Sequence, residues 1–195
     1  MPIRRVCVFC GSSPGHHPDY ARAAREVGTL LARESVGLVY GGSKTGLMGE
    51  IADAVLQAGG EAIGVIPDHL GTREVAHTGL SELHVVKSMH ARKAMMADLA
   101  DGFVGLPGGL GTMEEFFEVA TWSQLGIHAK PSVLLNVHGY YDLVVRFLDH
   151  AVNEGFVRAE HRALIAVCHA PDTILDALRS FRPTLAEKWL DRSER

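Results

Sequence analysis

The 195-residue sequence has little cysteine, no long hydrophobic run and no excess of positive charge. Its 3 cysteines are an odd number in a chain large enough to fold without disulfides, which predicts a reducing compartment, the cytoplasm. No apolar run approaches the roughly 20 residues that span a bilayer, and the apolar stretch Val6–Cys10 is too short for a secretion signal. A net charge of -4 excludes a bulk positive field that would hold nucleic acid or an anionic membrane.

Glycine is the residue that stands out, with 21 copies that are clustered along the chain. The remaining composition, 47% hydrophobic and 22% charged residues, is that of an ordinary globular protein. A chain of this length can fold around a single hydrophobic core. We therefore predict a single domain over residues 1–182 and a charged C-terminal tail over residues 183–195.

Apolar segments alternate with amphipathic segments along the whole chain. Ile3–Cys10 is a nearly continuous apolar run, typical of a strand buried on both faces, and residues 19–34 follow with apolar positions at helical spacing. The predicted strands cover residues 3–10, 36–40, 61–66, 83–86, 102–106, 132–137 and 164–168, and the predicted helices about 19–34, 47–58, 89–100, 112–125, 141–153 and 173–181. Strict alternation predicts an α/β fold with a doubly wound parallel sheet of about seven strands flanked by helices. A (βα)8 barrel is disfavoured, since it usually needs about 250 residues.

Three glycine-rich turns follow predicted strands, where ligands bind in open α/β sheets. They are CGSSPG (Cys10–Gly15), GGSKTGLMG (Gly41–Gly49) and PGGLGTMEE (Pro107–Glu115). Glycine lets main-chain N–H groups approach a ligand, and a helix N-terminus favours phosphate. Any one turn could be only a tight connection, but three together favour a phosphate-bearing ligand. The GxGxxG and GxxxxGK[ST] fingerprints are absent, which argues against dinucleotide binding and ATP hydrolysis.

A threonine and a glutamate in the third glycine-rich turn have two competing interpretations. Thr112 and Glu115 have the spacing of a helix capping box, and for this pair alone capping is the favoured interpretation. Glu114 and Glu118 crowd the same turns of the predicted helix, beside a glycine turn suited to an anion. A helix N-terminus stabilises carboxylates, so we expect Glu115 to be ionised at neutral pH. Such a carboxylate beside a phosphate site suits a cationic, oxocarbenium-like transition state.

A basic pair, Arg92 and Lys93, lies near the start of the helix predicted over residues 89–100. A solvated basic face is the ordinary explanation for such a pair. Both residues nevertheless follow a strand end at the same sheet edge as the glycine turns, where arginine offers a bidentate fork and lysine a point charge for phosphate or carboxylate. Glu74, in the irregular segment between residues 67 and 79, could add a polar contact to the ligand.

The motifs CGSSPG, GGSKTGLMG, MHARKA and PGGLGTMEE, in this order and spacing, resemble the Lonely Guy family of cytokinin riboside 5'-monophosphate phosphoribohydrolases. The likeness runs from about Arg5 to Phe181, and its specific part is the paired RK and PGGxGTxxE motifs. It implies a Rossmann-like fold, a homodimer or larger assembly, and hydrolysis of the N-glycosidic bond of a small nucleoside 5'-monophosphate without metal or organic cofactor. The products would be free base and ribose 5-phosphate.

The resemblance also implies roles for individual residues. Arg92 and Glu115 fall on the catalytic positions. The implied nucleotide-binding positions are Glu74, Lys93, Gly108, Gly109, Leu110, Gly111, Thr112, Met113, Glu114 and Thr121. In the mechanism we expect, main-chain amides of the glycine turn hold the 5'-phosphate and Glu115 stabilises the ribosyl cation and orients or deprotonates water, while Arg92 holds substrate or orients Glu115. Ser43 departs from the family pattern, which commonly has a third glycine there.

Two other functions are compatible with parts of this sequence pattern. A non-enzymatic carrier is the main alternative, because molybdenum cofactor carrier proteins resemble this fold and also use a glycine-rich phosphate site; the presence of both Arg92 and Glu115 favours the enzyme. A lysine decarboxylase would need a lysine for a pyridoxal phosphate Schiff base, and Lys93 is the only lysine in a suitable place.

The remaining motifs favour structural roles. Cys7 and Cys10 form a CxxC pattern, but Cys7 lies inside an apolar strand, so core packing is expected. Among the 11 histidines, His16 and His17 are the only adjacent pair and no HExxH occurs, so no metal site is predicted. The apolar residues of EEFFEVATWSQLG surround much of a helix, which fits a core or, by the family's dimerisation, a subunit interface.

Overall fold

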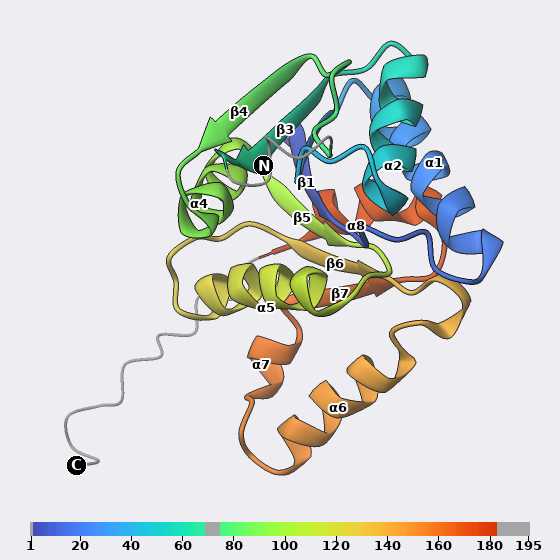
Figure 1. Ribbon diagram of the computed structural model, residues 1–195. Helices are drawn as coiled ribbons and strands as arrows, with labels where there is room; N and C mark the ends of the chain where they lie inside the picture. Colours follow the sequence, from blue (N-terminus) through green and yellow to red (C-terminus); the bar gives the residue numbers. More distant parts are fainter. Residues whose placement is uncertain (1, 69–74, 183–195) are drawn as a thin grey trace.

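A seven-stranded parallel sheet forms the centre of the protein, seen here in a computed structural model that describes residues 2–68 and 75–182 (Figure 1). The strand order is β4-β3-β2-β1-β5-β6-β7, and every neighbouring pair is parallel. The strands are β1 (Arg5–Phe9), β2 (Gly37–Tyr40), β3 (Ala62–Pro67), β4 (Glu82–Val86), β5 (Gly102–Gly105), β6 (Ser132–Leu135) and β7 (Ile165–Cys168). The predicted doubly wound parallel sheet is thereby confirmed.

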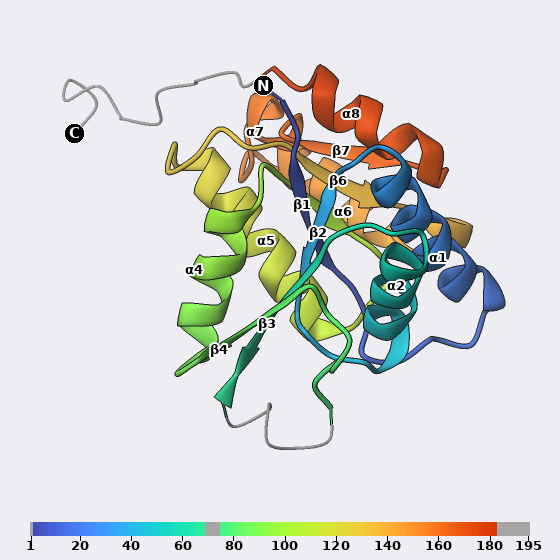
Figure 2. The same ribbon diagram turned by 90° about the horizontal axis from the view of Figure 1, so that it is seen from above.

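Helices cover both faces of this sheet (Figure 2). One face carries α1 (Pro18–Arg33), α2 (Gly46–Gln57) and α8 (Ile174–Ser180), and the other carries α4 (Met89–Leu99), α5 (Leu110–Gln124) and α6 (Asp142–Asn153). Short helices α7 (Ala159–Arg162), η1 (Val137–Gly139) and η2 (Pro171–Thr173) complete the elements of the described residues. Among the helices of these residues, none has both the length and the apolar character needed to cross a membrane.

The core is divided between the two faces by the alternation of strand side chains. In β1, Val6 and Val8 pack in the cluster beneath α1, α2 and α8, whereas Cys7 and Phe9 pack beneath α4 and α5. Because both faces are covered, the residues of the central strands β2, β3, β5 and β6 are buried whichever way they point, whereas the edge strand β4 is largely exposed. This is why the strands are readable in the sequence as continuous apolar runs, and it confirms that Cys7 is a core residue.

The beginning of α5 differs from the sequence prediction. The helix starts at Leu110, with Gly109 as its N-cap and no capping side chain, so Thr112 is the third helical residue. The capping box expected of Thr112 and Glu115 is therefore wrong. Two of the sequence predictions, Glu74 as a ligand contact and the tail over residues 183–195, lie outside the described residues.

The strand order reverses at β1, which lies between β2 and β5. The chain first adds β2, β3 and β4 on one side of β1, and then returns to add β5, β6 and β7 on the other. At the carboxyl ends of β1 and β5 the two glycine turns touch: the N–H of Gly11 donates to the carbonyl of Pro107 at 3.0 Å. Diverging loops at such a reversal open a crevice, which is where ligands bind in this class of sheet.

Candidate functional site

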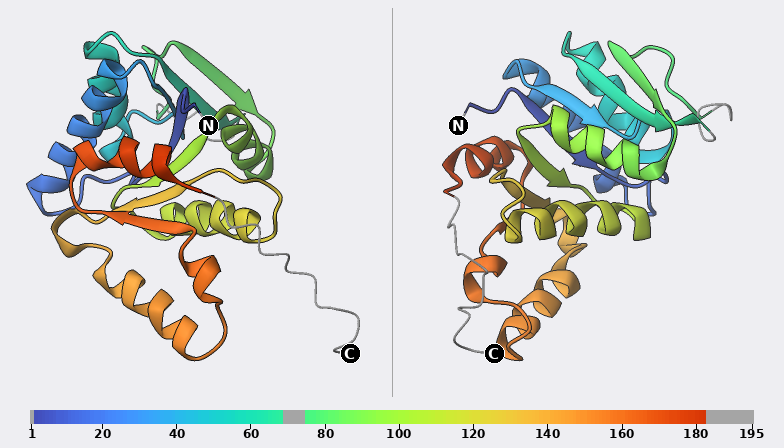
Figure 3. Two further views of the ribbon diagram at one scale, coloured as in Figure 1. Left: turned by 180° about the vertical axis from the view of Figure 1, so that it is seen from behind. Right: turned by 90° about the vertical axis from the view of Figure 1, so that its left-hand side faces the viewer.

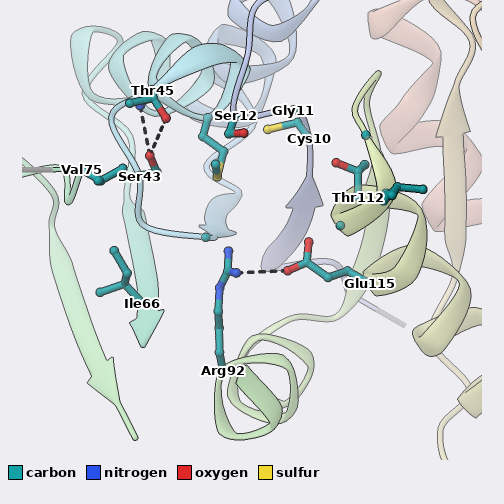
Figure 4. Close-up of a pocket in the computed structure, with 15 residues that line it drawn as sticks. Cys10, Gly11, Ser12, Ser43, Thr45, Ile66, Val75, Arg92, Thr112 and Glu115 are labelled. Atoms are coloured by element: carbon teal, nitrogen blue, oxygen red, sulfur yellow. Dashed lines mark hydrogen bonds and ion pairs between the residues drawn. The ribbon is translucent and has the colours of Figure 1, made fainter. Parts of the chain in front are cut away.

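A cavity of about 450 Å³ lies at this crevice, between the three glycine-rich turns and helix α4 (Figure 4). Arg92 and Glu115 point toward one another across it, and Ser12, Ser43 and Thr45 carry hydroxyl groups on its other wall. The residues that line it are Cys10, Gly11, Ser12, Gly41, Ser43, Thr45, Met48, Ile66, Val75, Arg92, Gly109, Leu110, Gly111, Thr112 and Glu115. The cavity thus brings together segments that are widely separated in the sequence.

Arg92 and Glu115 form a largely buried ion pair. Nη1 of Arg92 lies 3.4 Å from Oε1 of Glu115, and their side chains are only 11% and 13% exposed. Arg92 comes from α4, which begins after β4, and Glu115 comes from the second turn of α5, which follows β5. The guanidinium offers several N–H donors, so one contact with Glu115 leaves others for a ligand.

The position of Arg92 is fixed by its surroundings. Its Nε donates to the carbonyl of Val65 at 3.1 Å, at the end of β3. On the other side it packs against Gly41, where an added Cβ would lie 2.0 Å from Nη2 of Arg92. Gly41 is therefore a glycine because the arginine occupies the space that any side chain would need.

Glu115 sits in an environment that raises its pKa above 4.5. Burial is the largest cause, because it disfavours the charged form; the positive charge of Arg92 opposes it, and the neighbouring Glu114 adds to the increase. The helix N-terminus alone predicted stabilisation of the carboxylate. The structure adds burial, which the sequence pattern did not reveal, and the net direction is upward.

The turn before α5 presents main-chain donors to the cavity. The first N–H groups of a helix have no intrahelical acceptor, and in α5 these belong to Leu110, Gly111 and Thr112. Gly109 and Gly111 face open space, whereas a Cβ at Gly108 would lie 2.1 Å from Oγ1 of Thr112. Gly108 is thus required for packing, while the other two glycines keep the approach to the amides clear.

Lys93 and Glu114 lie outside the cavity lining. Lys93 is 8% exposed, and its ammonium group bridges to α5 through ion pairs with Glu114 and, at 3.1 Å, with Glu118. This bridge holds α4 against α5 and thereby sets the distance between the helices that carry Arg92 and Glu115. Met113 packs against the core, and Thr121 is exposed near the end of α5. Of the sequence-predicted positions, Arg92, Glu115, Gly109, Leu110, Gly111 and Thr112 line the cavity together.

Several lining residues were not predicted as site residues, although Ser43 stands out in the sequence by its departure from the family pattern and Cys10 by the CxxC pattern. Oγ of Ser43 lies 2.8 Å from Oγ1 of Thr45 and accepts from the N–H of Thr45 at 3.1 Å, which closes the second glycine turn at the cavity wall. Cys10 is buried at the end of β1, and burial raises the pKa of its thiol. The position of these residues directly after strands was the available signal, because they belong to the same turns as the glycines.

Two tyrosines support the third glycine turn from behind. Oη of Tyr140 donates to the carbonyl of Gly108 at 2.5 Å, and Oη of Tyr141 donates to the carbonyl of Leu106 at 2.6 Å. Both tyrosines follow η1, after strand β6. Because the carbonyl groups of the turn are held on this side, its N–H groups are free to face the cavity. No local pattern in the sequence indicates this support.

The sequence of this chain is similar to that of a known protein family and of several of its members. Residues 48–178 match a family described as "Possible lysine decarboxylase". A cytokinin riboside 5'-monophosphate phosphoribohydrolase of Rhodococcoides fascians is 49% identical over 178 residues, which are 91% of this chain and 90% of the relative. A probable enzyme of the same name from Oryza sativa subsp. japonica is 51% identical over 181 residues, 93% of this chain and 80% of the relative. One from Arabidopsis thaliana is 46% identical over 185 residues, 95% of this chain and 85% of the relative.

Solved structures with the same architecture are more distant in sequence. The molybdenum cofactor binding protein of Rippkaea orientalis superimposes with a TM-score of 0.70 at 20% identity, covering 92% of this chain and 98% of that one. The molybdenum cofactor carrier protein of Chlamydomonas reinhardtii gives 0.67 at 21% identity, covering 90% and 95%. At such identities the likeness establishes the shared fold and nothing about the ligand.

Proposed function

Because this chain belongs to the Lonely Guy family of cytokinin riboside 5'-monophosphate phosphoribohydrolases, we propose that it hydrolyses the N-glycosidic bond of such nucleotides. The substrate is an N6-modified adenosine 5'-monophosphate, with unmodified AMP as a candidate. Water adds to C1' of the ribose while the bond to the base nitrogen breaks. The products are free base, the active cytokinin, and ribose 5-phosphate.

The cavity supplies the groups that this reaction needs. The free N–H groups at the start of α5 bind the 5'-phosphate, which also gains from the positive end of the helix. Glu115 then faces the ribose, stabilises positive charge that develops at C1', and accepts a proton from the attacking water. Arg92 holds Glu115 in place and offers its remaining donors to the substrate.

The single observation that carries the proposal is the buried pair of Arg92 and Glu115 beside the amides of the α5 turn. A carboxylate and a phosphate site in the same cavity suit a substrate with a phosphate on one side of a ribose and a base on the other. Ligand binding alone would not require a carboxylate with a raised pKa in the cavity.

The test is a chromatographic assay of base release from isopentenyladenosine 5'-monophosphate, AMP and the unphosphorylated riboside, in buffer without metal ions or added cofactor. We expect release from a monophosphate and none from the riboside. Glu115→Gln keeps the shape of the side chain and should lower turnover roughly 10²- to 10⁴-fold with nucleotide affinity nearly unchanged. Wild-type turnover in this variant would refute the role of Glu115. No base from any monophosphate would favour the non-enzymatic carrier.

The same proposal covers the partners and the location of the chain. A nucleoside 5'-monophosphate is its small-molecule partner, a second copy of the chain is its protein partner, and nucleic acid and membranes are not. One domain, residues 1–182, carries the reaction. The cysteines at positions 7, 10 and 168 are all free, which supports a reducing compartment, the cytoplasm. A decarboxylase is disfavoured because Lys93 is engaged with Glu114 and Glu118, away from the cavity.

A further inference from the structure

Two histidines that are far apart in the sequence meet beside the glycine turns. His17 is the N-cap of α1, and His138 lies in η1, 121 positions further along the chain. Their rings stack with centroids 3.9 Å apart, and Asp19 completes the group. One ligand atom from each of the three residues lies within 4.8 Å of the others. The sequence pointed to His16 and His17 as neighbours, whereas the fold pairs His17 with His138.

The contacts of His17 and Asp19 bring two electron-pair donors close together. Nδ1 of His17 accepts a hydrogen bond of 3.3 Å from the N–H of Asp19, so this nitrogen carries no proton, and a metal ion bound at Nδ1 would replace that hydrogen bond. Oδ2 of Asp19 lies 3.4 Å from the same nitrogen. The other carboxylate oxygen, Oδ1, is already bound by Arg22 at 2.8 Å. Donor atoms around a tetrahedral zinc ion with bonds of about 2.0 to 2.1 Å are separated by roughly 3.4 Å.

His138 is held over this pair by an unusual backbone conformation. Its φ is 52° and its ψ is 32°, in the left-handed region that residues other than glycine seldom adopt. His138 is exposed and His17 and Asp19 are partly exposed, so the imidazole rings can turn toward an ion without disturbing the core. The carboxylate of Asp19, in the first turn of α1, offsets the repulsion of a cation by the helix N-terminus.

We propose that His17, Asp19 and His138 form a binding site for one divalent transition-metal ion. Two imidazole nitrogens and one carboxylate oxygen are a donor set that zinc accepts, with water in the remaining position. These residues do not line the cavity that holds Arg92 and Glu115. The ion therefore has a structural role: it ties the start of α1 to the turn that precedes α6.

The segment that carries His138 lies next to the proposed phosphate site. Tyr140, two residues after His138, donates to the carbonyl of Gly108 and also packs edge-on against Tyr20 of α1, with ring centroids 5.6 Å apart. A metal ion at His17 and His138 would hold the segment from which Tyr140 supports the glycine turn. The hydrolysis reaction does not involve this ion. A test of the metal site is therefore independent of a test of the proposed activity.

The test is a calorimetric titration of zinc into the full chain, freed of any affinity tag and in the absence of nucleotide, with cobalt absorption as a second readout. His17→Ser removes the imidazole but keeps an N-cap acceptor, and His138→Asn removes it with a residue that tolerates the left-handed region. His16→Ser is the matched control, because His16 is exposed and outside the group. Circular dichroism without metal verifies that each variant is folded.

We expect the wild type and His16→Ser to bind one zinc ion with equal affinity. His17→Ser and His138→Asn should each weaken binding at least about tenfold, which is the smallest loss expected even for groups that only support a ligand. Zinc should also raise the melting temperature of the wild type and of His16→Ser, but not of the double variant. The proposal is overturned if zinc binds no more tightly to the wild type than to His17→Ser/His138→Asn.

Discussion

Glu115 is subject to opposing influences that set the pH range in which the site works. Burial and the charges of Glu114 and Glu118 raise the pKa of Glu115, while Arg92 and Lys93 lower it, and the net pKa lies above 4.5. The ionised carboxylate is the form that stabilises a cation and accepts a proton. A raised pKa therefore shifts the loss of activity on the acid side to a higher pH than an ordinary glutamate would give.

The pH dependence can be tested at Glu118, a partly buried neighbour of Glu115. We expect kcat/KM of the wild type to fall as the pH is lowered through an apparent pKa above 4.5. Glu118→Gln removes a negative charge that raises the pKa of Glu115, so its acid limb should move to lower pH. The measurement is the pH profile of kcat/KM, with Glu26→Gln on the distant α1 as control. A limb at or below 4.5, or a shift of Glu118→Gln to higher pH, would contradict the assignment.

A substitution at Gly41 tests whether activity depends on the position of the Arg92 guanidinium. In Gly41→Ala the new Cβ would lie 2.0 Å from Nη2 of Arg92, so the guanidinium, the movable end of a long side chain, must shift away from Glu115. Since displacements of about 1 Å in a catalytic arrangement can cost roughly 10²-fold in rate, we expect a loss of that order with little change in melting temperature.

A double-mutant cycle shows whether Gly41 acts through Arg92. Gly41→Ala should lower turnover strongly in the wild type and scarcely at all in an Arg92→Ala background, where the clash is absent. Equal losses in both backgrounds would mean that the substitution perturbs something other than the arginine.

At the scale of the elements, the strands were more predictable than the beginnings of the helices. The central strands could be located because burial on both faces leaves a continuous apolar run, whereas the largely exposed edge strand β4 has only a short segment with apolar residues. The start of α5 was displaced by two residues because Gly109 caps the helix without a side chain, so no capping residue marks it. The helix α7 has only four residues and no apolar period of its own, and it was not predicted.

The site was predictable where its residues follow strands, and not where it depends on contacts between elements. Arg92, Glu115 and the glycines were found because the carboxyl ends of parallel strands share one edge. The bridge from Lys93 to Glu114 and Glu118, and the support of Gly108 by Tyr140, join elements whose separation only the fold defines. No local spacing in the sequence encodes such contacts.

At the scale of the whole molecule, the exposed apolar surface bears on the proposed homodimer. The core accounts for the apolar residues in the middle of α5, because Phe116 and Val119 are buried and Phe117 and Trp122 pack against the same cluster, whereas Leu110 at the start of the helix is 92% exposed. A group of exposed apolar side chains also lies on and just after α6, the helix that precedes the edge strand β7 (Figure 3). Its side chains Leu143, Phe147 and the following Phe156 are 72%, 63% and 88% exposed.

This surface leads to the expectation that α6 contributes to the contact between two copies. Leu143 and Phe147 are one helical turn apart and share a face, and an exposed apolar group of this kind indicates an interaction site. A two-fold dimer would bring the same face of each copy together and bury it. Phe147→Glu places a charge at the centre of that contact, where its burial without a partner is costly.

Light scattering coupled to size-exclusion chromatography measures the outcome directly. We expect the wild type to have twice the 21.1 kDa mass of the chain and Phe147→Glu to shift toward a single chain, with its circular dichroism spectrum unchanged. Gln57→Glu is the matched control, because it adds the same charge to an exposed position of α2 on the opposite face of the sheet. If Phe147→Glu and Gln57→Glu both remain dimeric, the contact lies elsewhere and the exposed face of α6 serves another partner.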